Sequence, residues 1–140
     1  MPPGFVASGA DQVSLLSYGE MISRKYLRRD GSAFDIIVAR TDSKGGAAAA
    51  CLGLVEAATA RGFEAISQSQ RGDGGILLIG RINGRASTAV FFTLGVVCGG
   101  AVMSGPIIDA GTSDANAAEQ FGHVLTQIER KARAYPDGYR

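Results

Sequence analysis

The stretch Phe34–Ser69, FDIIVARTDSKGGAAAACLGLVEAATARGFEAISQS, decides how this chain is organised. It opens with an apolar run typical of a strand, passes through a polar turn that can cap a helix, and continues in a helix-length segment of small residues. Gly62 stands where a left-handed C-terminal cap is favoured, and Phe63 begins a second extended run. These signals predict a strand, a helix over residues 45–61 and a further strand.

A hairpin is predicted before this stretch. The pair Asp30-Gly31 separates runs over residues 20–28 and 33–41, and an Asp-Gly pair between such runs is a strong hairpin signal. A helix over 18–28 is the alternative, because apolar and aromatic side chains there also recur at a spacing of four. Residues 1–17 are expected to form a loose N-terminal arm that turns into a short edge element.

An uncharged run extends from Ala86 to Ile108. The pair Asn83-Gly84 before it predicts a second hairpin. The run is long enough to cross a bilayer, so membrane insertion through 86–108 is one alternative. Its first half is rich in strand formers and its second half in glycine, which favours a core strand that continues into a buried turn.

The last predicted element is a helix over residues 114–134, whose apolar residues recur at spacings of three and four. His123 falls off that apolar stripe and is expected on the surface. The predicted order is therefore ββαβββα, in a single domain over residues 1–140. This is an α+β fold with a mainly antiparallel sheet of about five strands and two helices packed on one face.

The chain is nearly neutral, with fourteen Lys and Arg against thirteen Asp and Glu and a net charge of +1. Near neutrality argues against a partner recruited by bulk electrostatics, such as duplex nucleic acid or an anionic membrane. A local basic patch remains compatible with this composition.

Cys51 and Cys98 are the two cysteines of the chain. They make no CxxC pair, so no metal site of the usual spacing is predicted. Two buried thiols are expected, since free cysteine is among the most buried residue types. A disulfide is the alternative, and the redox state would report on the compartment.

The most basic segment contains Arg24, Lys25, Arg28 and Arg29. We interpret it as an edge strand that positive charge protects from pairing with other chains. An anion-binding basic face is the alternative, although no aromatic platform of the kind that binds single-stranded nucleic acid accompanies the charges.

The turn at residues 42–46 joins a strand to a helix, which is where backbone N–H groups can bind an anion. It lacks both GxxxxGK[ST] and GxGxxG, so a nucleotide site is not predicted. A small-ligand or anion-binding, enzyme-like domain would use this turn and the turn at 71–75, with Lys44 or Arg71 meeting the anion. No catalytic, cofactor-binding or metal-ligating residue is predicted.

Residues 18–70 resemble the core of small bacterial cell-envelope lipoproteins. The likeness lies in YGE, a short basic stretch, DGSAFDI, a turn, and a helix of the form AxxCLGLVEAATARGFEAI. The resemblance implies an envelope protein without catalysis, and it carries over no functional residues. The cysteine that would bear the lipid is missing from this sequence.

The sequence favours a non-catalytic cell-envelope or assembly module that acts through protein–protein interaction, including as a homo-oligomer. Low charge, the absence of paired catalytic groups, and apolar content in 76–108 beyond what one small core absorbs motivate this hypothesis. No cofactor and no nucleic-acid partner is expected, and membrane association would come through a lipid anchor. The expected location is the periplasm or cell envelope if a signal has been removed, and otherwise the cytoplasm.

Overall fold

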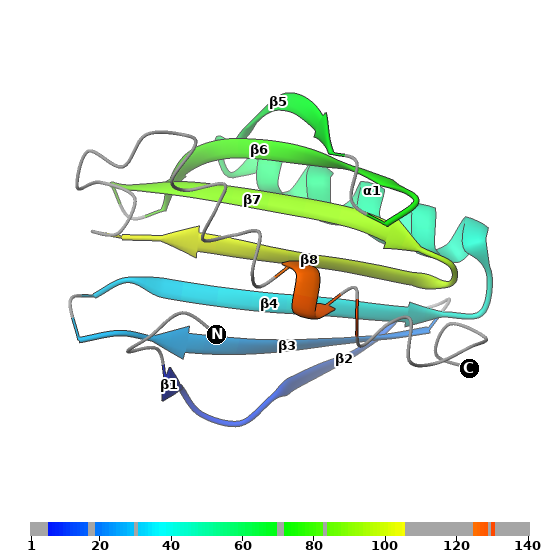
Figure 1. The fold of residues 1–140 in the computed structure, drawn as a ribbon, viewed down its shortest axis with the longest axis horizontal. Coiled ribbons are helices and arrows are strands. Elements are labelled where there is room, and N and C mark those ends of the chain that lie inside the picture. Colours follow the sequence, from blue (N-terminus) through cyan, green and yellow to red (C-terminus); the bar gives the residue numbers. More distant parts are fainter. Residues whose placement is uncertain are drawn as a thin grey trace.

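The structure is a computed structural model that describes residues 6–16, 19–29, 31–69, 72–82, 84–105, 125–128 and 130. These residues form an eight-stranded antiparallel sheet with one long helix against it (Figure 1). The strands are β1 (Val6–Ala7), β2 (Gln12–Leu16), β3 (Gly19–Leu27), β4 (Ala33–Thr41), β5 (Glu64–Ser69), β6 (Gly74–Ile82), β7 (Arg85–Leu94) and β8 (Val97–Ser104), and the helix is α1 (Lys44–Ala60).

The strands follow the order β1-β3-β4-β8-β7-β6-β5 across the sheet, and β2 also pairs with β3. β1 and β2 therefore share one edge, and β5 forms the other. α1 carries the chain from β4 in the middle of the sheet to β5, and it packs on β4, β8 and β7 on the way. The prediction of about five strands in the order ββαβββα, with two helices on one face, is wrong.

One of the strands that the sequence did not predict, β8, lies inside the uncharged run that begins at Ala86. Gly95 has a φ of 60°, a left-handed conformation that glycine adopts readily, and the chain reverses there. The run therefore forms an antiparallel hairpin of β7 and β8 and not one strand followed by a buried turn.

Two glycines lie inside β8, where the glycine-rich sequence predicted a turn. Gly99 and Gly100 lie opposite Phe92 and Phe91 of β7, which belong to cores on opposite faces of the sheet. The absent side chains leave space for the two rings, and a Cβ on Gly99 would lie 3.2 Å from the Phe92 ring. Glycine here serves close packing within a strand.

The other two strands that the sequence did not predict, β1 and β2, come from residues that were expected to form a loose N-terminal arm. β1 and β2 both pair with β3, so residues 6–7 and 12–16 belong to the sheet edge. The predicted hairpin on either side of residue 31 is confirmed as β3 and β4, with Gly31 at a φ of 90°. The alternative of a helix over 18–28 is wrong, because residues 19–27 are extended.

Each face of the sheet has its own core. On one face, α1 covers a cluster of Phe63, Leu78, Ala89 and Phe91, and the half-buried Leu54, Val55 and Ala58 of the helix pack against it. On the opposite face, Leu125 and Ile128 pack with Phe34, Val90, Phe92, Ala101 and Met103.

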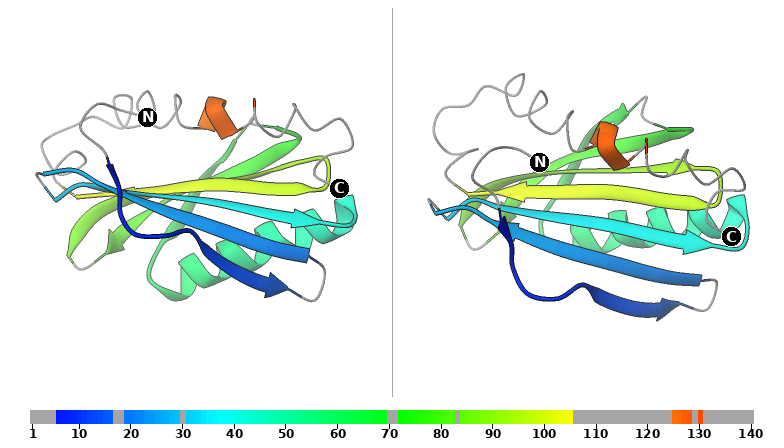
Figure 2. Two further views of the ribbon diagram at one scale, coloured as in Figure 1. Left: turned by 90° about the horizontal axis from the view of Figure 1, so that it is seen from below. Right: turned by 60° about the horizontal axis from the view of Figure 1, so that its bottom comes forward.

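The segment 125–128 therefore lies across the sheet from α1, not beside it (Figure 2). Residues 125–128 and 130 are helical, and the rest of the helix predicted over 114–134, with His123, lies outside the described residues. The physical reason for the placement is that the central strands are apolar on both faces, so both need a covering layer.

A disulfide joins Cys51 of α1 to Cys98 of β8, with the two Cα atoms 5.6 Å apart. The expectation of two buried thiols is wrong. Small residues allow this approach: Ala47 and Ala50 of α1 are buried against the sheet, and Cys98 itself is fully buried. The bond fastens the helix to the middle of the sheet.

Candidate functional site

The four basic residues of the segment 24–29 do not form one face. Arg24 and Lys25 are neighbours in β3, so their side chains point to opposite faces of the sheet. β3 is also not an outer strand, because β1 and β2 pair with it. The interpretation of this segment as a protected edge strand is therefore wrong.

Arg24 is paired within the protein. Its guanidinium donates two hydrogen bonds to Asp11, one of them 2.8 Å long from Nη2 to Oδ2. These hydrogen bonds lower the pKa of Asp11 below its ordinary value of 3.8 and raise the pKa of Arg24. This pair ties the chain between β1 and β2 to β3.

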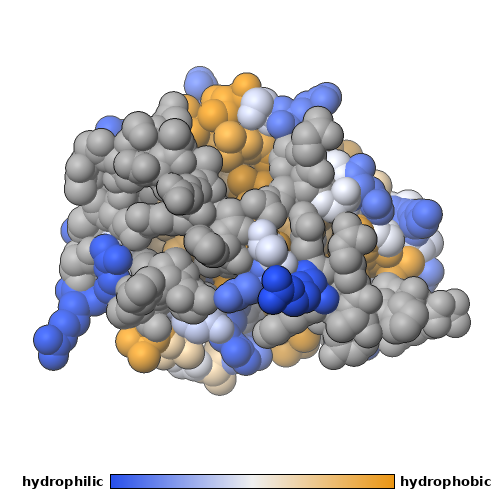
Figure 3. Space-filling view, in the orientation of Figure 1, coloured by the Kyte–Doolittle hydropathy of each residue, from blue (hydrophilic) through white to orange (hydrophobic). Residues whose placement is uncertain are grey.

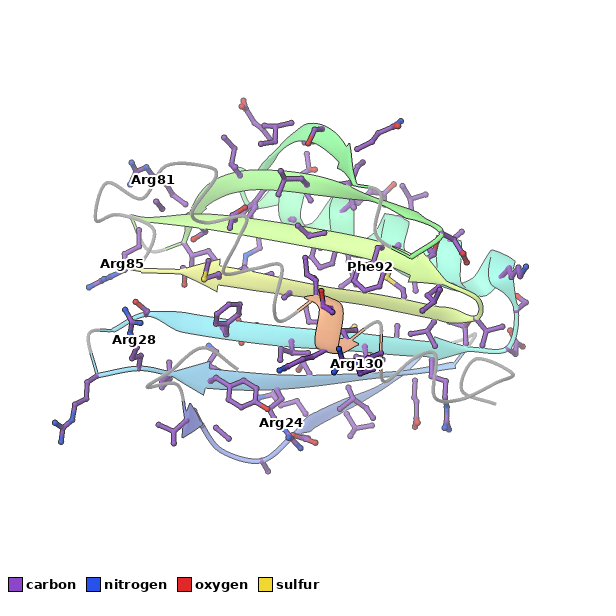
Figure 4. The ribbon with its side chains drawn as sticks, in the orientation of Figure 1. Arg24, Arg28, Arg81, Arg85, Phe92 and Arg130 are labelled. Atoms are coloured by element: carbon purple, nitrogen blue, oxygen red, sulfur yellow. A yellow bond between two sulfur atoms is a disulfide. The ribbon has the colours of Figure 1, made fainter. Side chains whose placement is uncertain are left out.

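Arg28 and Arg29 instead lie in the β3–β4 turn, at the same end of the sheet as two arginines of the β6–β7 hairpin, Arg81 and Arg85. Figure 4 shows Arg28, Arg81 and Arg85 at the same end of the sheet. A Cβ on Gly31, in the β3–β4 turn, would lie 3.6 Å from a guanidinium nitrogen of Arg85. We call Arg28, Arg29, Arg81 and Arg85 the arginine end.

The local fold explains this grouping. β4, β8, β7 and β6 are consecutive neighbours in an antiparallel sheet, so the β3–β4 turn and the β6–β7 turn lie at the same end. Arg81 is held across its own turn, where Nη1 donates a 2.8 Å hydrogen bond to the carbonyl oxygen of Gly84. Sequence reasoning missed Arg81 and Arg85, because only the strand order brings them to Arg28. The recurrence of arginine beside two hairpin turns was the available signal.

Asp35 lies near the arginine end on the face that α1 covers. Lys25 is its register partner on β3, and Arg61 follows the end of α1. Burial raises the pKa of Asp35, although the positive charges of Lys25 and Arg61 oppose the shift. The carboxylate thus sits between two cations at a place where its ionised form is poorly solvated.

Asp35→Asn is expected to raise the free energy of unfolding relative to the wild type at neutral pH. The raised pKa means that ionisation of Asp35 costs stability as the pH rises through the folded-state pKa, and that this cost is absent below the ordinary value of 3.8. Urea unfolding at neutral pH and at about pH 3 measures the difference, which should shrink in acid.

The matched control for this prediction is Asp11→Asn, which should behave with the opposite sign. Its pKa is lowered, so its ion pair stabilises the fold above the ordinary pKa and loses that effect as the pH falls through the folded value. A difference between wild type and Asp35→Asn that stays constant across this pH range would contradict the prediction.

The two turns proposed for anion binding lie together at the opposite end of the sheet. The Thr41 N–H donates a 3.0 Å hydrogen bond to the carbonyl oxygen of Val96 in the β7–β8 turn. The Gly95 N–H in that same turn donates a 2.8 Å hydrogen bond to the Asp73 carboxylate. Lys44 is exposed at the start of α1, whereas Arg71 lies outside the described residues.

Two backbone donors at this end are used by the protein's own groups. The Ser43 hydroxyl accepts a 2.9 Å hydrogen bond from Gly46 N–H and caps α1, while the Asp73 carboxylate occupies Gly95 N–H. A negative carboxylate among these turns also opposes the approach of an anion. The geometry therefore favours a structural role for these turns.

Across the described ranges, no group of three or more His, Cys, Asp or Glu side chains is placed to hold a metal ion. In that part of the chain no helix has the length and apolar character needed to span a membrane, and residues 86–105 form β7, β8 and their turns.

The apolar side chains of residues 76–82 and 84–105 lie largely in the two cores. Among the described residues of this range, Ile79 is the one large hydrophobic that is prominently exposed. The exposed large hydrophobic residues lie mainly elsewhere, at Val6, Val13, Ile22, Leu27, Leu52 and Ile66. The exposed apolar side chains therefore lie mainly on the N-terminal edge of the sheet, on α1 and on β5.

α1 presents such a surface on its outward side. No residue from Gly45 to Val55 is charged, and the helix is only weakly amphipathic. We call its exposed positions the uncharged helix face; they are Gly45, Ala48, Ala49, Leu52 and Gly53.

The fold defines a class of domain in which an antiparallel sheet is covered on both faces and cross-linked to its helix by one disulfide. Comparisons of this chain with known protein families, with curated proteins and with solved structures find no match.

Proposed function

We propose that this protein is a non-catalytic module of the cell envelope that binds a second copy of itself through the uncharged helix face. The observation that carries the proposal is the lack of charged residues at these exposed positions of α1. A helix on a protein surface normally turns charged and polar residues outward, whereas this one turns outward small residues and Leu52, which is 59% exposed. A covering partner removes that apolar surface from water.

The charges that flank the uncharged helix face favour a second copy as the partner. Consider an antiparallel pair of α1 helices that cross between Ala49 and Leu52. Glu56 of each copy then falls opposite Gly45 of the other, beside Lys44, so each copy offers one carboxylate and one cation. The small residues between these charges let the two backbones approach closely.

The Cys51–Cys98 disulfide supports placing this module in an oxidising compartment. Stable disulfides form in the bacterial periplasm and outside the cell, whereas cytosolic thiols are generally kept reduced. The resemblance of residues 18–70 to small envelope lipoproteins points to the same compartment.

Leu52→Glu is expected to weaken self-association by at least ~30-fold, which corresponds to about 2 kcal/mol. The reason is that each copy would place an unpaired carboxylate close to the two-fold axis of the interface. Size-exclusion chromatography with light scattering over a dilution series measures the change. Circular dichroism confirms that the variant keeps its fold.

Ile66→Glu is the matched control, because Ile66 is also an exposed aliphatic residue but lies on the edge strand β5. It should leave the dimer intact. A wild-type protein that stays monomeric at high concentration would contradict the proposal. So would a dimer that Ile66→Glu dissociates and Leu52→Glu does not, which would place the interface at the β5 edge.

A further inference from the structure

The arginine end gathers positive charge in a chain that is almost neutral overall. Arg29, Arg81 and Arg85 are exposed, and Arg28 is half-buried. At physiological ionic strength charges are screened beyond about 8 Å, so a surface acts through its local charge and not through the net charge of the chain. The near-neutral composition therefore does not weaken attraction at this end.

Two exposed aliphatic side chains adjoin these arginines. Val6 of β1 is the register partner of Leu27, and Leu27 directly precedes Arg28. Val6 is 69% exposed and Leu27 is 40% exposed. Figure 3 shows the apolar patch over β1 beside the hydrophilic tip of the β3–β4 turn, at the lower left of the molecule.

We propose that the arginine end docks on the surface of an anionic lipid bilayer. The exposed arginines of this end, Arg29, Arg81 and Arg85, bind headgroup phosphates. Val6 and Leu27 enter the interfacial region. Arginine suits this role because its planar donors match phosphate oxygens in pairs. The combination of basic residues with nearby apolar side chains is also the chemistry by which proteins lie on a membrane surface.

A bilayer fits these residues better than an acidic protein does. A stable protein interface buries about 800 Å² on each partner around a packed apolar centre, and two aliphatic side chains supply little of that. An anionic bilayer adds roughly 1 kcal/mol of attraction for each basic residue near its surface. Membrane docking at this end is independent of self-association through α1.

The test uses the full chain with two kinds of vesicle, pure phosphatidylcholine and equal parts of phosphatidylcholine and phosphatidylglycerol. Cosedimentation should show binding to the anionic vesicles and little to the neutral ones. Arg29→Gln with Arg85→Gln should lower the partition coefficient by about 25-fold, or roughly 5-fold for each arginine. Leu27→Ser should lower binding to the anionic vesicles as well.

A charge-matched control separates local from net charge. Arg40→Gln with Lys44→Gln removes two positive charges at the other end of the sheet, and it should leave vesicle binding nearly unchanged. Circular dichroism checks the fold of each variant. Raising the salt to about 1 M, where the Debye length is about 3 Å, should abolish most of the binding.

Three results would overturn the proposal. One is the absence of binding to anionic vesicles at low salt. Another is an equal loss of binding in the arginine-end variant and the charge-matched control. The third is full competition by soluble polyglutamate together with no effect of Leu27→Ser, which would make this end a site for an acidic protein.

Discussion

Reduction of the Cys51–Cys98 disulfide is expected to lower the free energy of unfolding by about 4 kcal/mol. The two cysteines are 47 residues apart, so the bond removes much conformational freedom from the unfolded chain. In the folded protein it joins α1 to a central strand. Most of the apolar residues that α1 turns to the sheet are small or only half-buried. Side-chain packing alone therefore holds the helix on the sheet only weakly once the disulfide is reduced.

Urea unfolding followed by circular dichroism, with and without a phosphine reductant, measures this effect. The double variant Cys51→Ala with Cys98→Ala is the control, since it should be about as unstable as the reduced wild type and should not respond to reductant. Titration of thiols in the unfolded, non-reduced protein gives an independent check. Two reactive thiols per chain in protein isolated without reductant would contradict both the disulfide and its use to assign an oxidising compartment.

Phe92→Ala is expected to lower the free energy of unfolding by about 3–5 kcal/mol. The Phe92 side chain is 1% exposed and belongs to the core on the face of the sheet away from α1. Its cross-strand neighbours are Gly75 on β6 and Gly99 on β8. Because neither glycine has a side chain that could move into the space, the cavity left by the ring should stay largely open.

Phe92→Leu is the conservative control and should cost clearly less, because much of the buried volume remains. Leu52→Ala, on the exposed outside of α1, should change the stability of the monomer by no more than about 0.5 kcal/mol. The measurement is urea unfolding at protein concentrations too low for the chain to self-associate. A loss below about 1 kcal/mol for Phe92→Ala would show that neighbouring side chains refill the site.

The sequence was a good guide where the signal was local. The polar turn at residues 41–43, the small residues and Gly62 together predicted a helix over 45–61. α1 spans Lys44–Ala60, and of the three candidates Ser43 is its cap. Gly84 has a φ of 79° between β6 and β7, as the predicted second hairpin requires. Both signals depend on backbone groups within a few residues of each other, so they do not require the tertiary contacts of the sheet.

The candidate surfaces depend on contacts that no local pattern contains. The sequence placed Arg24, Lys25, Arg28 and Arg29 together, but strand alternation sends the first two to opposite faces, and Asp11 pairs with Arg24. The strand order then brings Arg81 and Arg85 to the remaining arginines. Arginines beside two hairpin turns can be noticed in the sequence, but that the two turns share one end of the sheet follows only from the pairing of β4 with β8 and of β8 with β7.

By itself, the sequence determined the helix, its caps, the two hairpins around it and the apolar character of the strands, since each follows from the conformational preferences of neighbouring residues. Only the tertiary structure decided that Gly99 and Gly100 belong to a strand, that Cys51 meets Cys98, and that the segment 125–128 covers the face opposite α1. The physical reason is that these outcomes are set by the packing of side chains far apart in the chain. Phe91 and Phe92 need space on opposite faces of the sheet, and glycine on the neighbouring strand provides it.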